Sequence, residues 1–192
     1  KVNLKYLKIA EKAVERLIFI VKDLDLITKL ESNNMKLEKS KFNLISIINN
    51  VFEMLEIQAN KKNISLIIDS KLKRVNVNAD QEKIHQVLTN LIENSVKYGK
   101  QDGTTEISIE DLIEDKLIIR ITDNGKGIKK EHFERLFERF YRVENSGNRS
   151  TGGSGLGLAI VKHIIDAHNE KIYVESDFGV GSEFSFSLQK SN

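Results

Sequence analysis

The fold of this chain is decided by one stretch, QEKIHQVLTNLIENSVKY, which runs from Gln81 to Tyr98. Its apolar residues recur every three or four positions, the period of a helix with one buried face. These residues are Ile84, Val87, Leu88, Leu91 and Ile92. Asp80 precedes the stretch and is a residue type that caps helices. The pattern therefore predicts a capped helix that packs on a core.

The polar side of this helix carries Asn90, Asn94 and Lys97 at steps of four and three, which places them on one face. An amide oxygen is a hard, neutral ligand of the kind that Mg²⁺ accepts beside phosphate oxygens and water. A lysine offers phosphate a point charge. Taken alone, however, the pattern is more typical of a polar face turned to solvent.

Glycine gathers downstream of this helix, because seven of the 11 glycines lie between Gly125 and Gly157. One cluster, Asp123-Asn-Gly-Lys-Gly-Ile128, follows a predicted strand, and the other, Gly152-Gly-Ser-Gly-Leu-Gly157, opens a predicted helix. A glycine-rich helix start directs backbone N–H groups at an anion, most often phosphate. A dinucleotide-binding fingerprint would need a strand before the second cluster, and a Walker A motif would need Gly-Lys followed by Ser or Thr, so neither fits.

The rest of the chain mixes helix and strand patterns in the way of an α+β fold, with an antiparallel or mixed sheet and helices on one face. We expect helices at 43–60, 130–137 and 156–167. We expect strands at 64–68, 74–78, 106–110, 117–122, 171–175 and 183–188.

The N-terminal part, residues 4–31, reads as one long helix. Its apolar residues alternate three- and four-residue steps, the seam of a helical bundle or coiled coil. They are Leu7, Ala10, Val14, Leu17, Val21 and Leu24. This seam predicts packing against partner helices; the alternative is a helix folded back on its own domain.

Composition narrows the function classes further. Thirty Lys and Arg balance 28 Asp and Glu, so no strong field favours nucleic acid or membrane as a partner. Cysteine is absent, which excludes disulfides and thiolate metal sites. No apolar run approaches the roughly 20 residues of a membrane span. Because the chain starts at Lys1 rather than Met, we expect it to be a piece of a longer protein.

Four motifs in order resemble the N, G1, F and G2 boxes of two-component sensor histidine kinases. They are Asn90-Leu-Ile-Glu-Asn-Ser-Val-Lys-Tyr98, Asp123-Asn-Gly-Lys-Gly127, Phe137-Glu-Arg-Phe-Tyr-Arg142 and Gly153-Ser-Gly-Leu-Gly-Leu158. Glu175-Ser and Gly179-Val-Gly-Ser-Glu-Phe184 resemble the closing strands of that family. The resemblance implies an incomplete dimerisation hairpin at 1–36, represented by its second helix. It also implies a catalytic ATP-binding domain at 37–192.

This resemblance implies the Bergerat ATP-binding fold of the GHKL superfamily, a two-layer α/β sandwich, here behind a long bundle-type helix. It implies ATP and Mg²⁺ as ligands, with Asn94 and Asn90 on the metal and Asp123 on the adenine amino group. It implies a nucleotide lid at 144–152. Asn94, Lys97 and Arg142 would serve phosphoryl transfer. The remaining residues implied to contact nucleotide are Tyr98, Gly125, Gly127, Ile128, Tyr141, Gly153, Gly155, Leu156, Gly157 and Ser182.

The phosphoacceptor histidine of the family has no counterpart here. The chain's histidines are His85, His132, His163 and His168, and none is followed by the acidic residue and the Arg- and Pro-containing run of the family. We therefore expect a protein-histidine kinase domain that cannot phosphorylate itself. The expected partners are a response-regulator receiver domain and, in the intact protein, a second copy. The expected place is the cytoplasm, with membrane anchorage of the whole sensor left open.

Two other functions remain open on the sequence. One is an ATP-hydrolysing machine of the gyrase or chaperone type. Its catalytic glutamate, however, would stand at the position of Asn90, and Glu93 reads as a surface acid. The other is a nucleotide-gated interaction module without catalysis. The paired glycines that the family carries before its penultimate strand are replaced by His168-Asn169-Glu170, where Asn169 can adopt a left-handed turn.

Overall fold

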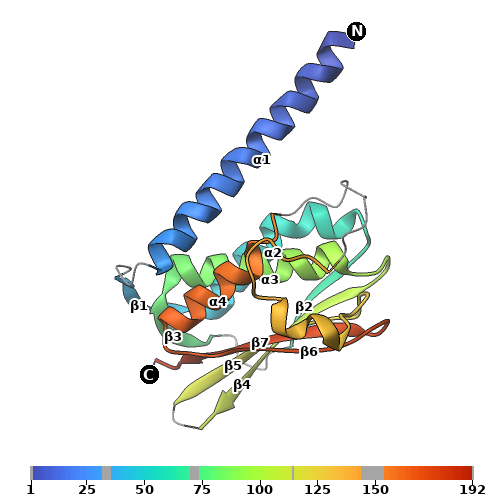
Figure 1. Ribbon diagram of the computed structural model, residues 1–192. Helices are drawn as coiled ribbons and strands as arrows, with labels where there is room; N and C mark the ends of the chain where they lie inside the picture. Colours follow the sequence, from blue (N-terminus) through green and yellow to red (C-terminus); the bar gives the residue numbers. More distant parts are fainter. Residues whose placement is uncertain (1, 32–35, 70–73, 114, 144–153, 192) are drawn as a thin grey trace.

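The computed structural model describes residues 2–31, 36–69, 74–113, 115–143 and 154–191. Beyond the long N-terminal helix α1 (Val2–Glu31), the chain forms two layers, as Figure 1 shows. Helices α2 (Leu44–Asn60), α3 (Gln81–Tyr98) and α4 (Gly157–Ala167) cover one face of a five-stranded sheet. The predicted α+β sandwich is confirmed.

The strand order of this sheet is β2-β4-β5-β7-β6. Its strands are β2 (Ser65–Asp69), β4 (Thr104–Leu112), β5 (Lys116–Asp123), β6 (Ile172–Asp177) and β7 (Gly181–Gln189). Strand β2 pairs parallel to β4, and the other neighbours pair antiparallel, so the sheet is mixed. Each strand lies within three residues of its predicted place at either end.

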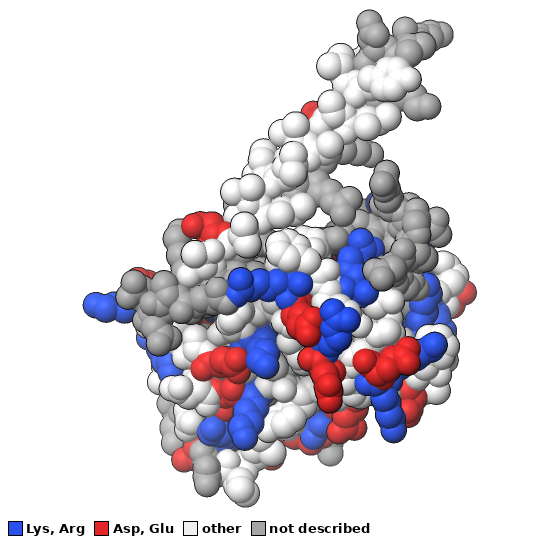
Figure 2. Space-filling view, viewed as in Figure 1, with Lys and Arg blue, Asp and Glu red and all other residues white. Residues whose placement is uncertain are grey.

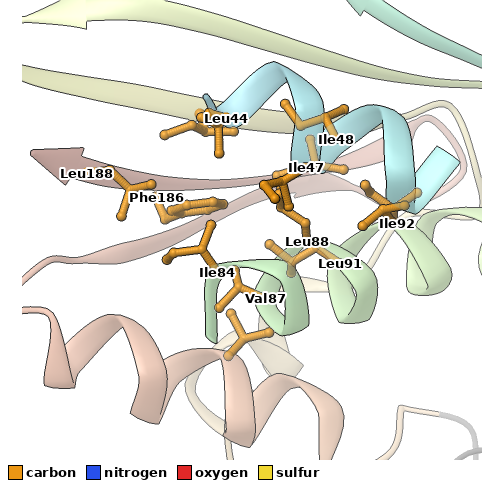
Figure 3. Close-up of a cluster of buried hydrophobic side chains, with 14 of the residues drawn as sticks. Leu44, Ile47, Ile48, Ile84, Val87, Leu88, Leu91, Ile92, Phe186 and Leu188 are labelled. Carbon is orange, nitrogen blue, oxygen red and sulfur yellow. The ribbon is translucent and has the colours of Figure 1, made fainter. Parts of the chain in front are cut away.

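The core lies between the helices and the inner face of the sheet, because strand residues alternate between buried and more exposed positions. In the register of β5 and β7, Ile119 is opposite Phe186 and Ile121 is opposite Phe184. Figure 3 shows Phe186 and Leu188 beside Leu44 and Ile48 of α2 and the apolar face of α3. The residues that the helical period singles out on α3 are therefore its buried residues.

A second, two-stranded sheet stands at the start of α3. It pairs β1 (Lys39–Asn43) with β3 (Asn76–Asp80) in antiparallel fashion. The prediction for β3 was two residues early, and β1 was missed. Strand β1 reads KSKFN and buries only Phe42, so it has neither apolar alternation nor length to reveal it.

The helix predicted at 130–137 is wrong in type and length. The structure has a 3-10 helix, η1 (Lys130–Arg135). Among residues 130–137 only Leu136 is buried, so no apolar face is available to stabilise a longer α-helix. The prediction for α4 is confirmed to within one residue, and Asn169 has the left-handed φ of 60° that its position requires.

Helix α1 extends away from the two layers in Figure 1 and leaves its seam open. Leu7, Val14 and Val21 are 65%, 55% and 63% exposed. Near its other end α1 contacts α4, and Ile20 packs against the core. A bundle partner for the seam stays a prediction. Within the described part of the chain, no helix has both the length and the apolarity to cross a membrane.

Candidate functional site

The polar face of α3 forms one wall of the candidate site. Asn90, Asn94 and Lys97 are each half-buried, whereas the opposite face of the helix is in the core. The Lys97 ammonium lies 5.0 Å from the centroid of the Tyr98 ring. Asp80 caps this helix, because its Oδ1 accepts a hydrogen bond from the Lys83 backbone at 3.1 Å. The predicted cap is confirmed. Asn90, Asn94 and Lys97 lie on the side of α3 opposite its buried face, as predicted.

A carboxylate closes the site at the end of β5. Asp123 Oδ1 accepts a hydrogen bond from the backbone N–H of Gly125 at 2.8 Å. Burial raises the pKa of Asp123, while the N–H groups of Gly125 and Ser182 and the charge of Lys100 lower it by less. A carboxylate so placed accepts hydrogen bonds and donates none. It is therefore suited to bind an exocyclic amino group of a ligand, because such a group donates hydrogen bonds.

Gly125 brings the Asp123 turn directly against the end of α3. A Cβ on Gly125 would stand 2.6 Å from Asp123 Oδ1 and 2.7 Å from the Tyr98 carbonyl oxygen, so no larger residue fits without displacement. The backbone N–H of Lys126 donates to the same Tyr98 carbonyl at 3.4 Å. Asp123 and Tyr98, which are 25 positions apart in the sequence, therefore belong to one site.

The turn that follows is held by a serine whose role the sequence did not reveal. Ser176 Oγ donates to the Gly181 carbonyl at 2.6 Å and accepts from the Ile128 backbone N–H at 2.8 Å. Since the one hydroxyl hydrogen of Ser176 is used on Gly181, the Ser182 hydroxyl, 2.9 Å away, is the donor to Ser176. Ser182 itself is buried and is the cross-strand partner of Asp123. The motif placed Ile128 and Ser182 beside Asp123, but only the fold brings in Ser176.

Helix α4 begins against the polar face of α3. A Cβ on Gly157 would stand 3.1 Å from Asn90 Oδ1, so the start of α4 and the amide of Asn90 are in close contact. Before it, Gly155 has a φ of 75° and lies against the backbone of Phe140, and Leu156 is fully buried. The first turn of α4, whose N–H groups have no partner within the helix, therefore lies close to Asn90. Gly153 and the predicted lid at 144–152 lie outside the described residues.

Tyr141 and Arg142, predicted near the phosphates, are both half-buried. The Tyr141 hydroxyl is 2.7 Å from His132 Nδ1, and the Arg135 guanidinium lies 4.3 Å from the Tyr141 ring centroid. The sequence assigned no role to His132. It holds Tyr141, a contact for which the sequence carried no signal.

A second histidine joins the helices that carry the site. His168 is buried, and its Nε2 accepts a hydrogen bond from the Asp80 backbone N–H at 3.0 Å. Its Nδ1 is 2.8 Å from the Ile164 carbonyl and is the donor of that pair. Burial lowers the pKa of His168, so the ring is neutral. This bond fixes the start of α3 to the end of α4.

The donor set can be compared with the needs of a magnesium ion. The described residues contain no cluster of three His, Cys, Asp or Glu side chains that could hold a metal alone. The half-buried amides of Asn90 and Asn94 offer neutral oxygens instead. Mg²⁺ uses few protein ligands when phosphates and water complete its octahedron, so these residues fit the ion together with a nucleotide.

The face of the molecule in Figure 2 carries charged side chains of both signs. Lys and Arg are interspersed with Asp and Glu over the two-layer part, without a large area of one sign. With a formal net charge of only +2, attraction of an anion to the site depends on local residues such as Lys97 rather than on net charge.

The chain is similar to known proteins over most of its length. Residues 79–192 match the family model of histidine kinase-, DNA gyrase B- and HSP90-like ATPases. Sensor histidine kinase WalK of Bacillus subtilis is 32% identical over 185 residues, which are 96% of this chain and 30% of that protein. The chain thus spans about a third of the length of the curated relatives it matches.

Solved structures with a similar fold are also histidine kinases. The catalytic domain of histidine kinase ThkA superposes with a TM-score of 0.69 at 31% identity, over 80% of this chain and 97% of that one. Histidine kinase ThkA in complex with response regulator protein TrrA superposes with a TM-score of 0.75 at 30% identity. That match covers 97% of this chain, α1 included, and 51% of the other.

Proposed function

We propose, from the premise that this chain belongs to the family of histidine kinase-, DNA gyrase B- and HSP90-like ATPases, that it binds ATP and phosphorylates a histidine. The observation that carries the proposal is the half-buried Asp123 carboxylate, which is set against Tyr98 and Gly125. The polar face of α3 and the start of α4 flank it. The described part of the chain would thus supply both a base-recognition end and a phosphate end.

At the base end, Asp123 would accept a hydrogen bond from the adenine amino group. Gly125 and Gly127 would let the backbone pass close to the ring, with Tyr98 against the base and Ile128 and Ser182 completing the wall. A guanine presents a carbonyl where adenine presents its amino group. It would therefore place an acceptor against the carboxylate, which is the basis of the expected preference for ATP.

At the phosphate end, Asn90 and Asn94 would hold Mg²⁺ together with phosphate oxygens. When bound, the ion neutralises phosphate charge. Lys97 would contact a phosphate through its ammonium, and Arg142 would stabilise charge on the transferred group, with Tyr141 beside it. Gly153, Gly155 and Gly157 of the last motif would form the phosphate end of the lid, with the N–H groups at the start of α4 directed at the phosphates.

In the proposed reaction a histidine nitrogen attacks the γ-phosphorus of ATP. A P–N bond forms, the bond from the γ-phosphorus to the β–γ bridging oxygen breaks, and ADP leaves with that electron pair. The imidazole gives up its proton to a base outside this chain. Phosphoryl transfer depends on positioning and charge neutralisation, which are the services that these residues can offer.

The acceptor histidine would lie on another helix of the intact protein, paired with α1. The proposal assigns residues 1–36 to the second helix of a dimerisation hairpin and residues 37–192 to the catalytic domain. The exposed seam of α1 supports this division. A response-regulator receiver domain is the proposed onward partner, since ThkA, which is similar over 97% of this chain, forms a complex with one. A kinase of this type would act in the cytoplasm, where ATP is.

Calorimetric titration with a non-hydrolysable ATP analogue, with and without Mg²⁺, tests the site. The wild type should bind, Asp123→Asn should lose affinity, and Asn94→Ala should lose the Mg²⁺ dependence. Absence of binding by the folded wild type at millimolar nucleotide would contradict the proposal.

Incubation with ATP and a histidine-bearing helical hairpin tests the chemistry. Acid-labile phosphate on the hairpin supports the kinase. Rapid phosphate release to water without transfer would favour an ATPase. Nucleotide binding with neither outcome would favour an interaction module gated by ATP.

A further inference from the structure

The last turn of α3 is closed by a lysine from a different part of the chain. Lys62 Nζ donates hydrogen bonds to the carbonyl oxygens of Lys97 at 2.5 Å, Val96 at 3.1 Å and Gly99 at 3.4 Å. A helix leaves its last carbonyls without N–H partners of its own. A cation is the favourable partner there, because it also faces the negative end of the helix dipole.

The backbone of Lys62 is fixed on both sides. Its N–H donates to the Ala59 carbonyl at 3.0 Å, and its carbonyl accepts from the Asp102 N–H at 2.9 Å. Next to it, the Asn63 amide donates to Asp102 Oδ1 at 2.7 Å. The backbone of Lys62 is therefore held between the end of α2 and the turn after α3, within reach of the α3 carbonyls.

The surroundings of the Lys62 ammonium disfavour its positive charge. Burial lowers the pKa of Lys62, and the nearby charge of Lys126 lowers it further. Three carbonyl oxygens on one ammonium offset that loss of hydration. By contrast its neighbour Lys61 is exposed.

The carbonyls that Lys62 contacts lie in the same helix end as two residues of the proposed site, Lys97 and Tyr98. Tyr98 stands between the carbonyls of Lys97 and Gly99, and its own carbonyl accepts from Lys126 N–H and abuts Gly125. With Ser95 accepting from the Gly99 N–H at 2.7 Å, every carbonyl from 95 to 99 has a partner. The end of α3 is thereby fixed both to Lys62 and to the Asp123 turn.

We propose that Lys62 is a positioning residue of the nucleotide site, which acts by fixing Lys97 and Tyr98 at the end of α3 relative to Asp123. It does so through the backbone of α3. This inference rests on the proposed function, because it assumes that the polar face of α3 and the Asp123 turn bind ATP.

The test compares Lys62→Met, which keeps the apolar stem and removes the charge, with Lys61→Met as the matched control on an exposed neighbour. Affinity for a non-hydrolysable ATP analogue with Mg²⁺ is measured by calorimetry, and folding by thermal unfolding. Lys62→Met should bind on the order of tenfold more weakly, from the loss of charge-assisted hydrogen bonds. Lys61→Met should bind as the wild type does.

Chemical rescue separates positioning from a general loss of structure. Lys62→Ala leaves room for a small alkylammonium ion, so n-propylammonium should restore affinity, whereas tetramethylammonium, which has no N–H donor, should not at equal ionic strength. Should Lys62→Met fail to fold, Lys62→Ala without an added ammonium ion, which also lacks an N–H donor, replaces it in the titration.

Wild-type affinity in folded Lys62→Met, or in folded Lys62→Ala without an added ammonium ion, would overturn the inference. Equal responses of Lys62→Ala to the two ammonium ions would overturn it as well. Failure of the proposed function is a distinct result: the folded wild type itself would then bind no nucleotide, or Asp123→Asn would bind as tightly as the wild type.

Discussion

His168 accepts a hydrogen bond from the backbone N–H of Asp80 across 88 positions of sequence, at 3.0 Å. The bond joins the end of α4 to the residue that caps α3. A protonated imidazole has no acceptor nitrogen, so this link exists only while the ring is neutral. Stability should therefore depend on the protonation of His168.

The direction of that dependence follows from the lowered pKa of His168. As the pH falls, the ring in the unfolded chain takes up its proton near the ordinary histidine pKa of 6.5, before the ring in the folded protein does. The stabilising contribution is complete above that pH and is lost as the pH falls from 6.5 through the lowered folded pKa. The expected result is a steep fall in the free energy of unfolding over this range, measured by urea titration.

His168→Gln serves as the control for this prediction, since its side-chain oxygen can accept from Asp80 without titrating. Its free energy of unfolding should change less between neutral and mildly acidic pH. His168→Ala should cost about 1–3 kcal/mol at neutral pH, because the Asp80 N–H would stay buried without its partner. Parallel pH curves for wild type and His168→Gln would contradict the assignment.

Asp123→Asn should separate stability from binding. Burial disfavours the Asp123 charge, so the amide should leave the free energy of unfolding at neutral pH unchanged or raise it. Affinity for an ATP analogue should fall about ten- to a hundredfold, because an amide is a poorer acceptor for the adenine amino group. Urea unfolding and calorimetry on the same sample check both parts.

The raised pKa of Asp123 also predicts the pH dependence of binding. The carboxyl takes up its proton at a higher pH than an ordinary aspartate with a pKa of 3.8, and the protonated form cannot accept as a carboxylate does. Affinity should therefore fall as the pH decreases towards this raised value. The contribution of Asp123 to folding stability changes with pH in the opposite direction to its contribution to binding. Because the folded state binds the proton more tightly than the unfolded chain, stability is lost as the pH rises through the folded pKa.

Gly157→Ala tests the contact between α4 and the polar face of α3. The added Cβ would stand 3.1 Å from Asn90 Oδ1, which forces the amide or the helix start to shift by a few tenths of an ångström. Alanine is the better helix former by roughly 0.5–1 kcal/mol, so thermal stability should be kept. Affinity for the nucleotide with Mg²⁺ should nevertheless fall. Unchanged affinity would show that the contact does not position Asn90.

Gly127→Ala and Gly179→Ala form a matched pair for backbone strain. Both glycines have positive φ, 66° and 89°. A Cβ on Gly127 would also collide with the Asp177 backbone, whereas a Cβ on Gly179 meets nothing within 4 Å. Both variants should lose roughly 1–2 kcal/mol from the left-handed conformation. Gly127→Ala should lose clearly more in urea unfolding, and equal losses would contradict the close packing.

Elements with a strong apolar period were predictable from the sequence. Helix α3 and its Asp80 cap are examples, as are the central strands. Strand β1 was not, because one buried residue, Phe42, carries no period. The site residues came from ordered motifs, and the fold sets Gly125 against Asp123 and Tyr98, and Gly157 against Asn90. Their roles towards ATP stay predictions.

Lys62, His168 and Ser176 were not recognised from the sequence for a common physical reason. Each acts through a contact with a residue that is distant along the chain or through backbone groups. Neither kind of contact produces a recognisable pattern in the neighbouring sequence. Lys62 has no feature that separates it from Lys61 until α3 is packed beside it. Such contacts depend on tertiary structure, which a single sequence read locally does not provide.

Helix α3 is closed at both ends by side chains from outside it, with His168 behind the cap at its first turn and Lys62 at its last. Isolated helices fray from their ends, and that is how their amide hydrogens reach solvent. Here fraying at either end must first break a tertiary contact. The amide hydrogens of α3 should thus exchange only when the whole domain opens, which makes this helix a slow-exchanging core element rather than a locally mobile one.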